Sequence, residues 1–276
     1  MSFWEGKTIL VTGGAGSIGS QVVKELLKQP INNVRAFDTN EDALFTLQRQ
    51  IGGGNENFRW LLGDVRDRER VKMAIRGVNI VIHAAAIKNI EVSEYNAAET
   101  CRVNIDGTIN MVETCLKAGV ERFFLISSDK AANYSTLYGA TKFIGEKIVS
   151  WASRISDSTM FAATRFGNVV ESRGNVFQVW ESEVKQGVPL TITHPNMTRY
   201  WWHIDEAATF IISRIQHMEN GYIYIPKMTK YNLMDMARKF CEDKGVPLTF
   251  NVTGPRRGEK EVEELYNNNE EVEERE

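Results

Sequence analysis

A tyrosine and a lysine stand four residues apart in YGATK, at Tyr138 and Lys142. On a helix, residues i and i+4 lie on the same face, so the two side chains can meet. A free phenol has a pKa of about 10, and a nearby ammonium favours its ionised form. The pair therefore predicts a general base that removes a proton from a substrate hydroxyl. Ser128, at the end of an apolar run, is expected to hydrogen-bond the same hydroxyl.

An acid and a second amine, Asp129 and Lys130, come directly after Ser128. Simple oxidation of an alcohol makes no use of them. Adjacent residues of a strand point to opposite faces, so both side chains can reach one site only if the pair lies in a turn. The alternative interpretation is an ordinary Asp-Lys turn at the surface.

A glycine turn, with Gly13, Gly16 and Gly19, stands between the apolar run KTILVT and a helical pattern. Such a turn lets the backbone approach a pyrophosphate, and N–H groups at the helix start face its negative charge. Asp38 ends the next apolar run, 19 residues beyond Gly19, where a carboxylate can accept hydrogen bonds from ribose hydroxyls. Its charge repels a 2′-phosphate, and no arginine follows at 39–41, so NAD is favoured and NADP stays possible.

The elements that must position these residues are short apolar runs that alternate with amphipathic stretches. This alternation predicts an α/β fold, a Rossmann-like doubly wound parallel sheet covered by helices on both faces. After about residue 170 the pattern loosens into a smaller substrate-binding lobe. We therefore expect an NAD(P)-binding domain over 1–170 and a partly interleaved C-terminal lobe over 171–276.

Composition and charge exclude several classes of protein. The net charge of −3 is concentrated in residues 259–276, where nine Glu oppose Lys260 and Arg275, so the rest of the chain is mildly positive. That suits an anionic small molecule and is far too weak for nucleic acid. Three scattered cysteines without CxxC spacing predict neither disulfides nor a metal site. With no signal pattern and no apolar run of membrane-spanning length, we expect a cytoplasmic protein that does not bind a membrane.

Several segments occur in the order found in one known family: TGGAGSIG, HAAAIKN, SSDKA, YGATK, RFGNV-x-x-SRG, TRYWWHIDEA and RRGEK-x-x-E-x-L. They resemble the extended short-chain dehydrogenase/reductases. Within that group they are most similar to the inverting UDP-N-acetylglucosamine 4,6-dehydratases of the polysaccharide-biosynthesis (CapD-like) family. The glycine loop and YxxxK are shared by the whole superfamily, whereas the Asp-Lys pair and the SRG segment are narrower signals.

The resemblance implies an enzyme that oxidises carbon 4 of a nucleotide sugar, eliminates water and returns hydride to carbon 6. Elimination from the 4-ketone needs a base at carbon 5 and an acid at oxygen 6. By resemblance Lys130 is the base and Asp129 the acid, while Tyr138, Lys142 and Ser128 serve the oxidation. A base must be neutral and an acid protonated, so we expect the two pKa values to shift toward each other.

Cofactor contacts are expected along the ends of the first four strands. Asp64 and Val65 are placed beside the adenine, although Asp64 can equally be a turn or cap residue. The complete expected set is Gly13, Gly16, Ser17, Ile18, Gly19, Asp38, Asp64, Val65, Ala84, Ala85, Ala86 and Lys142.

Substrate contacts are implied by segments that bind the nucleotide in the family, and arginine forks suit diphosphate oxygens. The expected residues are Lys88, Asn168, Arg173, Arg199, Arg256 and Glu259. The chain departs from the family at Tyr134 and Arg257, which replace common prolines, and at Trp201, Trp202 and His203, which replace smaller residues. A packed role is expected for His203.

Quaternary structure and function leave alternatives open. The helical segments 91–118 and 137–154 resemble the pair that forms the dimer contact in this superfamily, so a homo-oligomer is expected. A UDP-sugar 4-epimerase would need Tyr138 and Lys142 but neither Asp129 nor Lys130. A non-catalytic regulator that binds NAD or a nucleotide sugar could share the fold.

Overall fold

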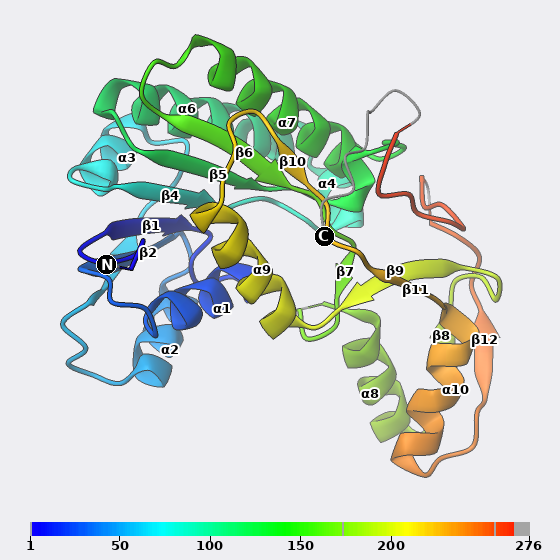
Figure 1. Ribbon diagram of the computed structural model, residues 1–276. Coiled ribbons are helices and arrows are strands. Elements are labelled where there is room, and N and C mark those ends of the chain that lie inside the picture. The colour runs from blue at the N-terminus through cyan, green and yellow to red at the C-terminus, as the bar shows by residue number, and fades with distance from the viewer. Residues whose placement is uncertain (1, 173, 257, 268–276) are drawn as a thin grey trace.

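A computed structural model describes residues 2–172, 174–256 and 258–267 of the chain (Figure 1). Within this part a seven-stranded sheet runs through the molecule, and every neighbouring pair of its strands is parallel. The strands in spatial order are β10 (Ile223–Tyr224), β6 (Met160–Thr164), β5 (Arg122–Ile126), β4 (Ile80–His83), β1 (Thr8–Thr12), β2 (Asn33–Asp38) and β3 (Phe58–Leu62). The order reverses direction between β1 and β4, the point where open sheets of this kind bind ligands.

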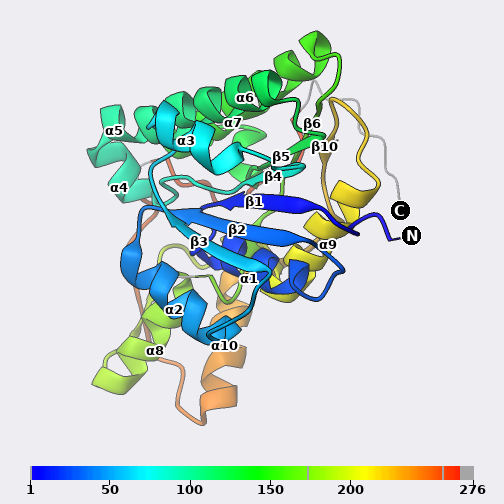
Figure 2. The ribbon, with the colours of Figure 1, turned by 90° about the vertical axis from the view of Figure 1, so that its left-hand side faces the viewer.

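Helices cover both faces of the sheet, as Figures 1 and 2 show. Side chains alternate along the buried strands, so Ile9 and Val11 of β1 join one core cluster while Leu10 joins the other. This is the pattern expected of strands buried on both faces. One face carries α1 (Ser17–Leu26), α2 (Glu41–Ile51) and α9 (Ile204–Gln216); the other carries α3 (Arg68–Ile75), α6 (Gly107–Ala118) and α7 (Leu137–Ile155).

The predicted helical segment 91–118 is divided into shorter pieces. These are α4 (Ile90–Tyr95), α5 (Ala97–Cys101), the π-helical turn η1 (Arg102–Asp106) and α6. Asn104 of the π turn is 4% exposed; it accepts from the Ile87 N–H (2.8 Å) and donates to the Ile87 carbonyl and to Thr141, both at 3.0 Å. The irregular turn therefore ties the loop after β4 to α7.

The C-terminal half builds a smaller unit beside the sheet and also contributes to the sheet itself. The smaller unit has its own core around Trp180 and Phe240. Its elements are β7 (Asn168–Val169), α8 (Val176–Gln186), β8 (Leu190–Ile192), β9 (Thr198–Trp202), β11 (Thr229–Asn232), α10 (Leu233–Lys244) and β12 (Phe250–Val252). In contrast, α9 lies on α1, and β10 pairs with β6 (Figure 1).

The α/β class and the parallel sheet covered on both faces are confirmed. The boundary near residue 170 stays a prediction, because α9 and β10 follow it in sequence yet lie with the large sheet. No helix in the described ranges is long and apolar enough to cross a membrane. The same ranges contain no group of three metal-ligating side chains placed to hold an ion.

Candidate active site

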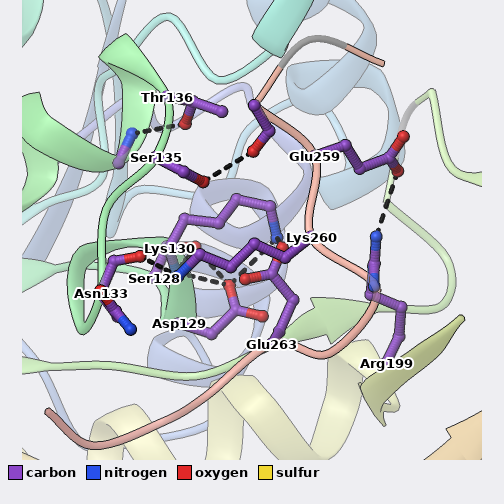
Figure 3. Close-up of polar contacts among 12 residues, drawn as sticks. Ser128, Asp129, Lys130, Asn133, Ser135, Thr136, Arg199, Glu259, Lys260 and Glu263 are labelled. Carbon is purple, nitrogen blue, oxygen red and sulfur yellow. Dashed lines mark hydrogen bonds and ion pairs between the residues drawn. The ribbon is translucent and has the colours of Figure 1, made fainter. Parts of the chain in front are cut away.

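The Asp-Lys pair lies in a turn directly after β5, as the sequence required. Ser128 precedes the single 3₁₀ turn η2 (Asp129–Ala131) and donates its hydroxyl hydrogen to Oδ1 of Asp129 at 2.7 Å. The Asp129 N–H donates to the Phe166 carbonyl at 3.0 Å, which ties the turn to the end of β6. The turn places both side chains on one side, toward the same group of charges (Figure 3).

The Lys130 side chain is held between two carboxylates. Its Nζ lies 3.2 Å from Oδ1 of Asp129 and 3.5 Å from Oε1 of Glu263. Burial favours the neutral amine, but Asp129 and Glu263 outweigh it, so the pKa of Lys130 is raised. The expectation that this pKa would be lowered is wrong for this arrangement, because the sequence did not reveal the second carboxylate.

Asp129 keeps one oxygen without a protein partner. The residue is 1% exposed, and its Oδ2 has no hydrogen-bond partner among the described residues. Oδ1, in contrast, accepts from Ser128, from the Lys130 N–H at 2.9 Å and from Lys130 Nζ. A buried oxygen without a partner is costly unless a ligand or water bonds to it. Oδ2 is therefore the atom of this group best suited to meet a substrate.

Tyr138 and Lys142 are both buried on α7, one helical turn apart. Burial raises the pKa of Tyr138, while the Lys130 ammonium and a hydrogen bond with Ser128 act in the opposite direction. Lys142 Nζ donates to the Ile126 carbonyl at 2.6 Å, and burial lowers its pKa to about 8 against the effect of Glu146. The foremost cation acting on the phenol is thus Lys130, and not Lys142 as the helical spacing predicted.

A buried histidine that was not among the predicted site residues lies at the end of β4. His83 is 1% exposed, with Nδ1 2.6 Å from the Thr12 hydroxyl and Nε2 3.1 Å from the Thr108 hydroxyl. Burial, with a smaller effect of Lys142, lowers its pKa to about 3, so the ring is neutral at physiological pH. It joins the ends of β1 and β4 to α6. The only sequence signal was a polar residue closing an apolar run.

The glycine turn and the loop after β4 are packed directly against each other. Gly13 has a φ of +63°, and a Cβ there would lie 2.7 Å from the Ala85 nitrogen. A Cβ at Gly19 would lie 2.1 Å from the Gly13 carbonyl oxygen. Gly16 is the N-cap of α1 and supplies no capping side chain. A tight turn against an uncapped helix start has the features that receive a pyrophosphate, so the residues fit the predicted dinucleotide.

The two predicted adenosine-side carboxylates lie at the ends of β2 and β3. Asp38 accepts from the Ala15 N–H at 3.1 Å and from the Asn40 N–H at 3.0 Å, which places it beside the glycine turn. Asp64 instead forms an ion pair with Arg66 at 2.5 Å. Hydrogen bonds from the Arg66 side chain and N–H lower the pKa of Asp64.

The remaining cofactor candidates lie around these turns. Val65 is buried against Gly107, where a Cβ would lie 2.6 Å from the valine Cγ2. Ser17 and Ile18 begin α1, and Ala84, Ala85 and Ala86 form the loop after β4. Their contacts to a cofactor, and that of Asp64, stay predictions.

Three of the predicted substrate residues lie together. Arg199 of β9 is 6% exposed and forms an ion pair with Glu259 at 3.1 Å. The Arg256 N–H donates to the same carboxylate at 3.1 Å, and its guanidinium pairs with Glu91 at 2.9 Å.

The other substrate candidates are more dispersed. Asn168 stands opposite Trp201 in the pairing of β7 with β9, and Lys88 is exposed in the loop after β4. Arg173 lies outside the described residues.

The C-terminal strap, defined here as residues 258–267, crosses over the Asp-Lys turn (Figure 3). Ser135 Oγ donates to the Gly258 carbonyl at 2.6 Å, and Asn133 donates to Glu264 at 3.0 Å. On the other side, the Thr198 N–H donates to the Glu261 carbonyl at 2.9 Å. The strap carries Glu263 to Lys130. Glu263 belongs to the E-x-L motif, whose sequence alone did not indicate a role for this residue.

A buried ion pair connects several of the elements that form the site. Arg165 and Glu146 have side chains that are 0% and 1% exposed and lie 2.7 Å apart. Ser127 donates to the same glutamate at 2.5 Å, and Arg165 donates to the Leu265 carbonyl at 2.9 Å. The pair therefore joins β5, β6, α7 and the strap.

His203 is not packed, contrary to the sequence-based expectation. Its side chain is 67% exposed and forms an ion pair with Glu171 at 2.9 Å. His203 is the N-cap residue of α9, and its N–H donates to the Glu206 side chain at 3.3 Å. The hydrogen bond with Glu171 raises its pKa. These contacts place His203 at a helix N-terminus and not in a packed core.

Comparisons with known proteins place this arrangement in a family. A protein of Methanocaldococcus jannaschii named "Uncharacterized membrane protein MJ1061" is 39% identical over 96% of this chain and 81% of its own length. "UDP-N-acetylglucosamine 4,6-dehydratase (inverting)" of Campylobacter jejuni subsp. jejuni serotype O:23/36 is 37% identical over 93% of this chain and 76% of its own. The X-ray structure of Pen from Bacillus thuringiensis is 32% identical, with a TM-score of 0.92 over 96% of this chain and 85% of its own.

The family model described as "Polysaccharide biosynthesis protein" matches residues 9–276. That range includes the glycine turn, the Asp-Lys turn, α7 and the strap. On this match over almost its full length, the chain belongs to the polysaccharide-biosynthesis protein family.

Proposed function

We propose that this chain is a nucleotide-sugar 4,6-dehydratase that acts on UDP-N-acetylglucosamine and inverts carbon 5. The observation that carries the proposal is the pairing of Asp129 and Lys130, 3.2 Å apart, in the buried cluster that also holds Tyr138. Oxidation of a hydroxyl uses Tyr138 together with Lys142 and Ser128, whereas elimination needs a further base and acid. The Campylobacter relative is named as an inverting UDP-N-acetylglucosamine 4,6-dehydratase.

The cofactor that the residues fit is NAD, with NADP as the alternative. Its pyrophosphate would be held by the glycine turn and the start of α1, and its ribose by Asp38. Bound there, NAD would supply a hydride acceptor for carbon 4 and later a hydride donor for carbon 6. The chain's own contribution is to hold the sugar and to move protons.

Oxidation begins with the loss of the proton on the 4-hydroxyl. Tyr138, in its ionised form, takes that proton as general base, and Ser128 orients the same hydroxyl. The cation at Lys130 opposes the rise in the Tyr138 pKa that burial causes. Lys142, which donates to the Ile126 carbonyl, anchors α7 against the end of β5.

Elimination needs Lys130 neutral and Asp129 protonated, and a single proton shift produces both states. The ammonium Nζ and the carboxylate Oδ1 are 3.2 Å apart, within reach for transfer of one proton from lysine to aspartate. Lys130 then takes the carbon-5 proton, while Asp129 gives its proton to oxygen 6, and water leaves. The two side chains end in the charged states in which they began, so protons balance across the step.

Binding of the substrate diphosphate requires a rearrangement of the ion pairs on the substrate side. Arg199 and Arg256 now face Glu259 and Glu91. A diphosphate can compete for these guanidiniums because arginine forks bind phosphate and carboxylate oxygens with the same geometry. Lys88, Asn168 and Arg173 are proposed as further contacts to the sugar or nucleotide.

We also propose a homo-oligomer formed through α4 and α7. Ile144, Trp151 and Ile155 of α7 are 38%, 45% and 51% exposed, and their spacing places them on one helix face. Tyr95 of α4 is 91% exposed. Large apolar side chains in such a stripe are typical of an interface. Sedimentation at several concentrations measures the oligomer; a monomer at every concentration would contradict this assignment.

The reaction is tested by incubation with UDP-N-acetylglucosamine in deuterated water. The proposal expects a 4-keto, 6-deoxy product with deuterium at carbon 5. Formation of UDP-N-acetylgalactosamine with no deoxy sugar would instead establish the 4-epimerase alternative. Binding of NAD and substrate without turnover would point to the non-catalytic regulator.

A further inference from the structure

One carboxylate beside the proposed catalytic lysine comes from the far end of the chain. Glu263 is 5% exposed, and its Oε1 lies 3.5 Å from Lys130 Nζ. Its neighbour Glu264 is exposed and hydrogen-bonds Asn133 instead. Carboxylates are rarely buried unless they are paired. The pairing with Lys130 therefore accounts for the burial of Glu263, and the strap contacts hold it there.

The charged groups around Lys130 come from four elements. Asp129 belongs to the same turn, Tyr138 to α7, Arg199 to β9 and Glu263 to the strap. Arg199 opposes the charge of Lys130 but is itself paired with Glu259. Asp129 must become protonated to act as the acid of the proposed elimination. Glu263 is then the carboxylate that still faces the lysine during the step.

Resting on the proposed dehydratase function, we propose that Glu263 is a positioning residue for the elimination. Its carboxylate holds the Lys130 amine beside Asp129 and strengthens the lysine as a base toward carbon 5. Glu263 touches neither sugar nor cofactor in this role and acts through Lys130 alone.

The charge of Glu263 has two opposing consequences for the elimination step. A negative charge beside the amine favours the ammonium, so it reduces the fraction of neutral lysine at a given pH. The same charge stabilises the ammonium that forms when the carbon-5 proton arrives, which makes the neutral lysine a more effective base. Removal of the charge should therefore move the pH profile of carbon-5 exchange to lower pH and lower its plateau at high pH.

The first test measures Lys130 directly and does not depend on turnover. The Nζ resonance of Lys130 is followed by NMR in protein labelled with nitrogen-15 lysine and assigned by its loss in Lys130→Met. In Glu263→Gln, which keeps the shape of the side chain, the titration midpoint of Lys130 should fall by about one to two pH units. In Glu264→Gln, the matched change on the same strap, it should stay at the wild-type value. An unchanged midpoint in Glu263→Gln overturns the proposal.

The second test measures carbon-5 deuterium exchange against pH in the same proteins. Glu263→Gln should show a lower midpoint and a plateau reduced by roughly 3- to 10-fold, with the initial oxidation of the sugar retained. If carbon-5 exchange in Glu263→Gln fell by the same factor at every pH, and Glu264→Gln showed the same loss, the strap would have only a structural role. If Glu263→Gln does not fold, Glu263→Ala replaces it, because it also removes the charge, and an unchanged Lys130 midpoint there overturns the proposal.

Failure of the proposed function is distinguishable from failure of this inference. Wild-type protein that exchanges no carbon-5 proton would refute the dehydratase assignment. The titration of Lys130 would still decide whether Glu263 controls the charge of the lysine.

Discussion

Lys130 folds back onto its neighbour in the chain, so that its Nζ lies 3.2 Å from Oδ1 of Asp129 while Oδ2 of that carboxylate has no partner among the described residues. One oxygen is engaged by the proposed base, and the other is left for a ligand. A surface Asp-Lys turn would leave both side chains in water, whereas here Asp129 is 1% exposed. The geometry therefore favours a shared chemical role for the two residues.

Lys130→Met should separate the two halves of the reaction, because it keeps the aliphatic stem and removes the amine. We expect this variant to oxidise the sugar and to accumulate reduced cofactor with a 4-keto hexose. It should neither exchange the carbon-5 proton nor release water. Absorbance of the reduced cofactor and NMR of the sugar measure the two halves.

The Lys130→Met experiment needs a pH control, because Lys130 also acts on Tyr138. Loss of the ammonium should raise the Tyr138 pKa further and move oxidation to higher pH. If reduced cofactor fails to form at every pH, the lysine belongs to the oxidation step or to folding. If the variant keeps full activity, the assignment of the base is wrong.

Tyr138→Phe should retain binding of cofactor and substrate but lose oxidation at carbon 4. The change removes one hydroxyl and little volume, and loss of a general base costs about 100- to 10,000-fold in rate. Tyr134→Phe is the matched control, since Tyr134 is 52% exposed and packs on Phe143. Near-normal turnover of Tyr138→Phe would contradict the assignment of Tyr138 as the general base.

Asp38→Ala should weaken NAD binding by about 1–3 kcal/mol through the loss of hydrogen bonds to a charged acceptor. Because Asp38 also accepts two backbone N–H groups, Asp38→Asn tests the charge with less disturbance of the turn. Asp42→Ala, at an exposed position of α2, is the control. Calorimetric titration gives the affinities. Tighter binding of NADP than NAD by the wild type would contradict the interpretation of Asp38.

The buried amine of Lys142 should make stability depend on pH. Its pKa is about 8 when folded against an ordinary value of 10.5, so between these values the unfolded chain binds more protons. The free energy of unfolding therefore rises with pH across this window, by about 3 kcal/mol in total. Lys142→Met should remove this rise. Urea unfolding of both proteins from about pH 7 to about pH 10 measures this rise in the free energy of unfolding. An equal rise with pH in both proteins would contradict the burial argument.

Glu146→Gln should destabilise the fold by about 3–5 kcal/mol, because it removes one carboxylate from a buried ion pair. Lys147→Gln, one residue further along α7 and exposed, should change stability by no more than about 0.5 kcal/mol. Denaturant unfolding compares the two. A similar small effect in both variants would show that Arg165 is compensated by its other contacts.

The sequence by itself determined the features that depend on short spacings. The glycine turn, the i and i+4 placement of Tyr138 and Lys142, and the Asp-Lys turn after a strand all arise from residues close together in the chain. Backbone geometry sets these relationships, so they were correctly predicted together with the alternating elements of the parallel sheet.

Only the tertiary structure decided the charge state of the site. Glu263 and Lys130 are 133 positions apart and meet because the strap crosses the Asp-Lys turn. A pKa reflects burial and every nearby charge, whichever part of the chain supplies them. The pKa of Lys130 was therefore predicted in the wrong direction, and the buried supports at His83 and Glu146 were missed. Motif spacing predicted which groups are proposed to react. The tertiary structure determines which of them carries a proton.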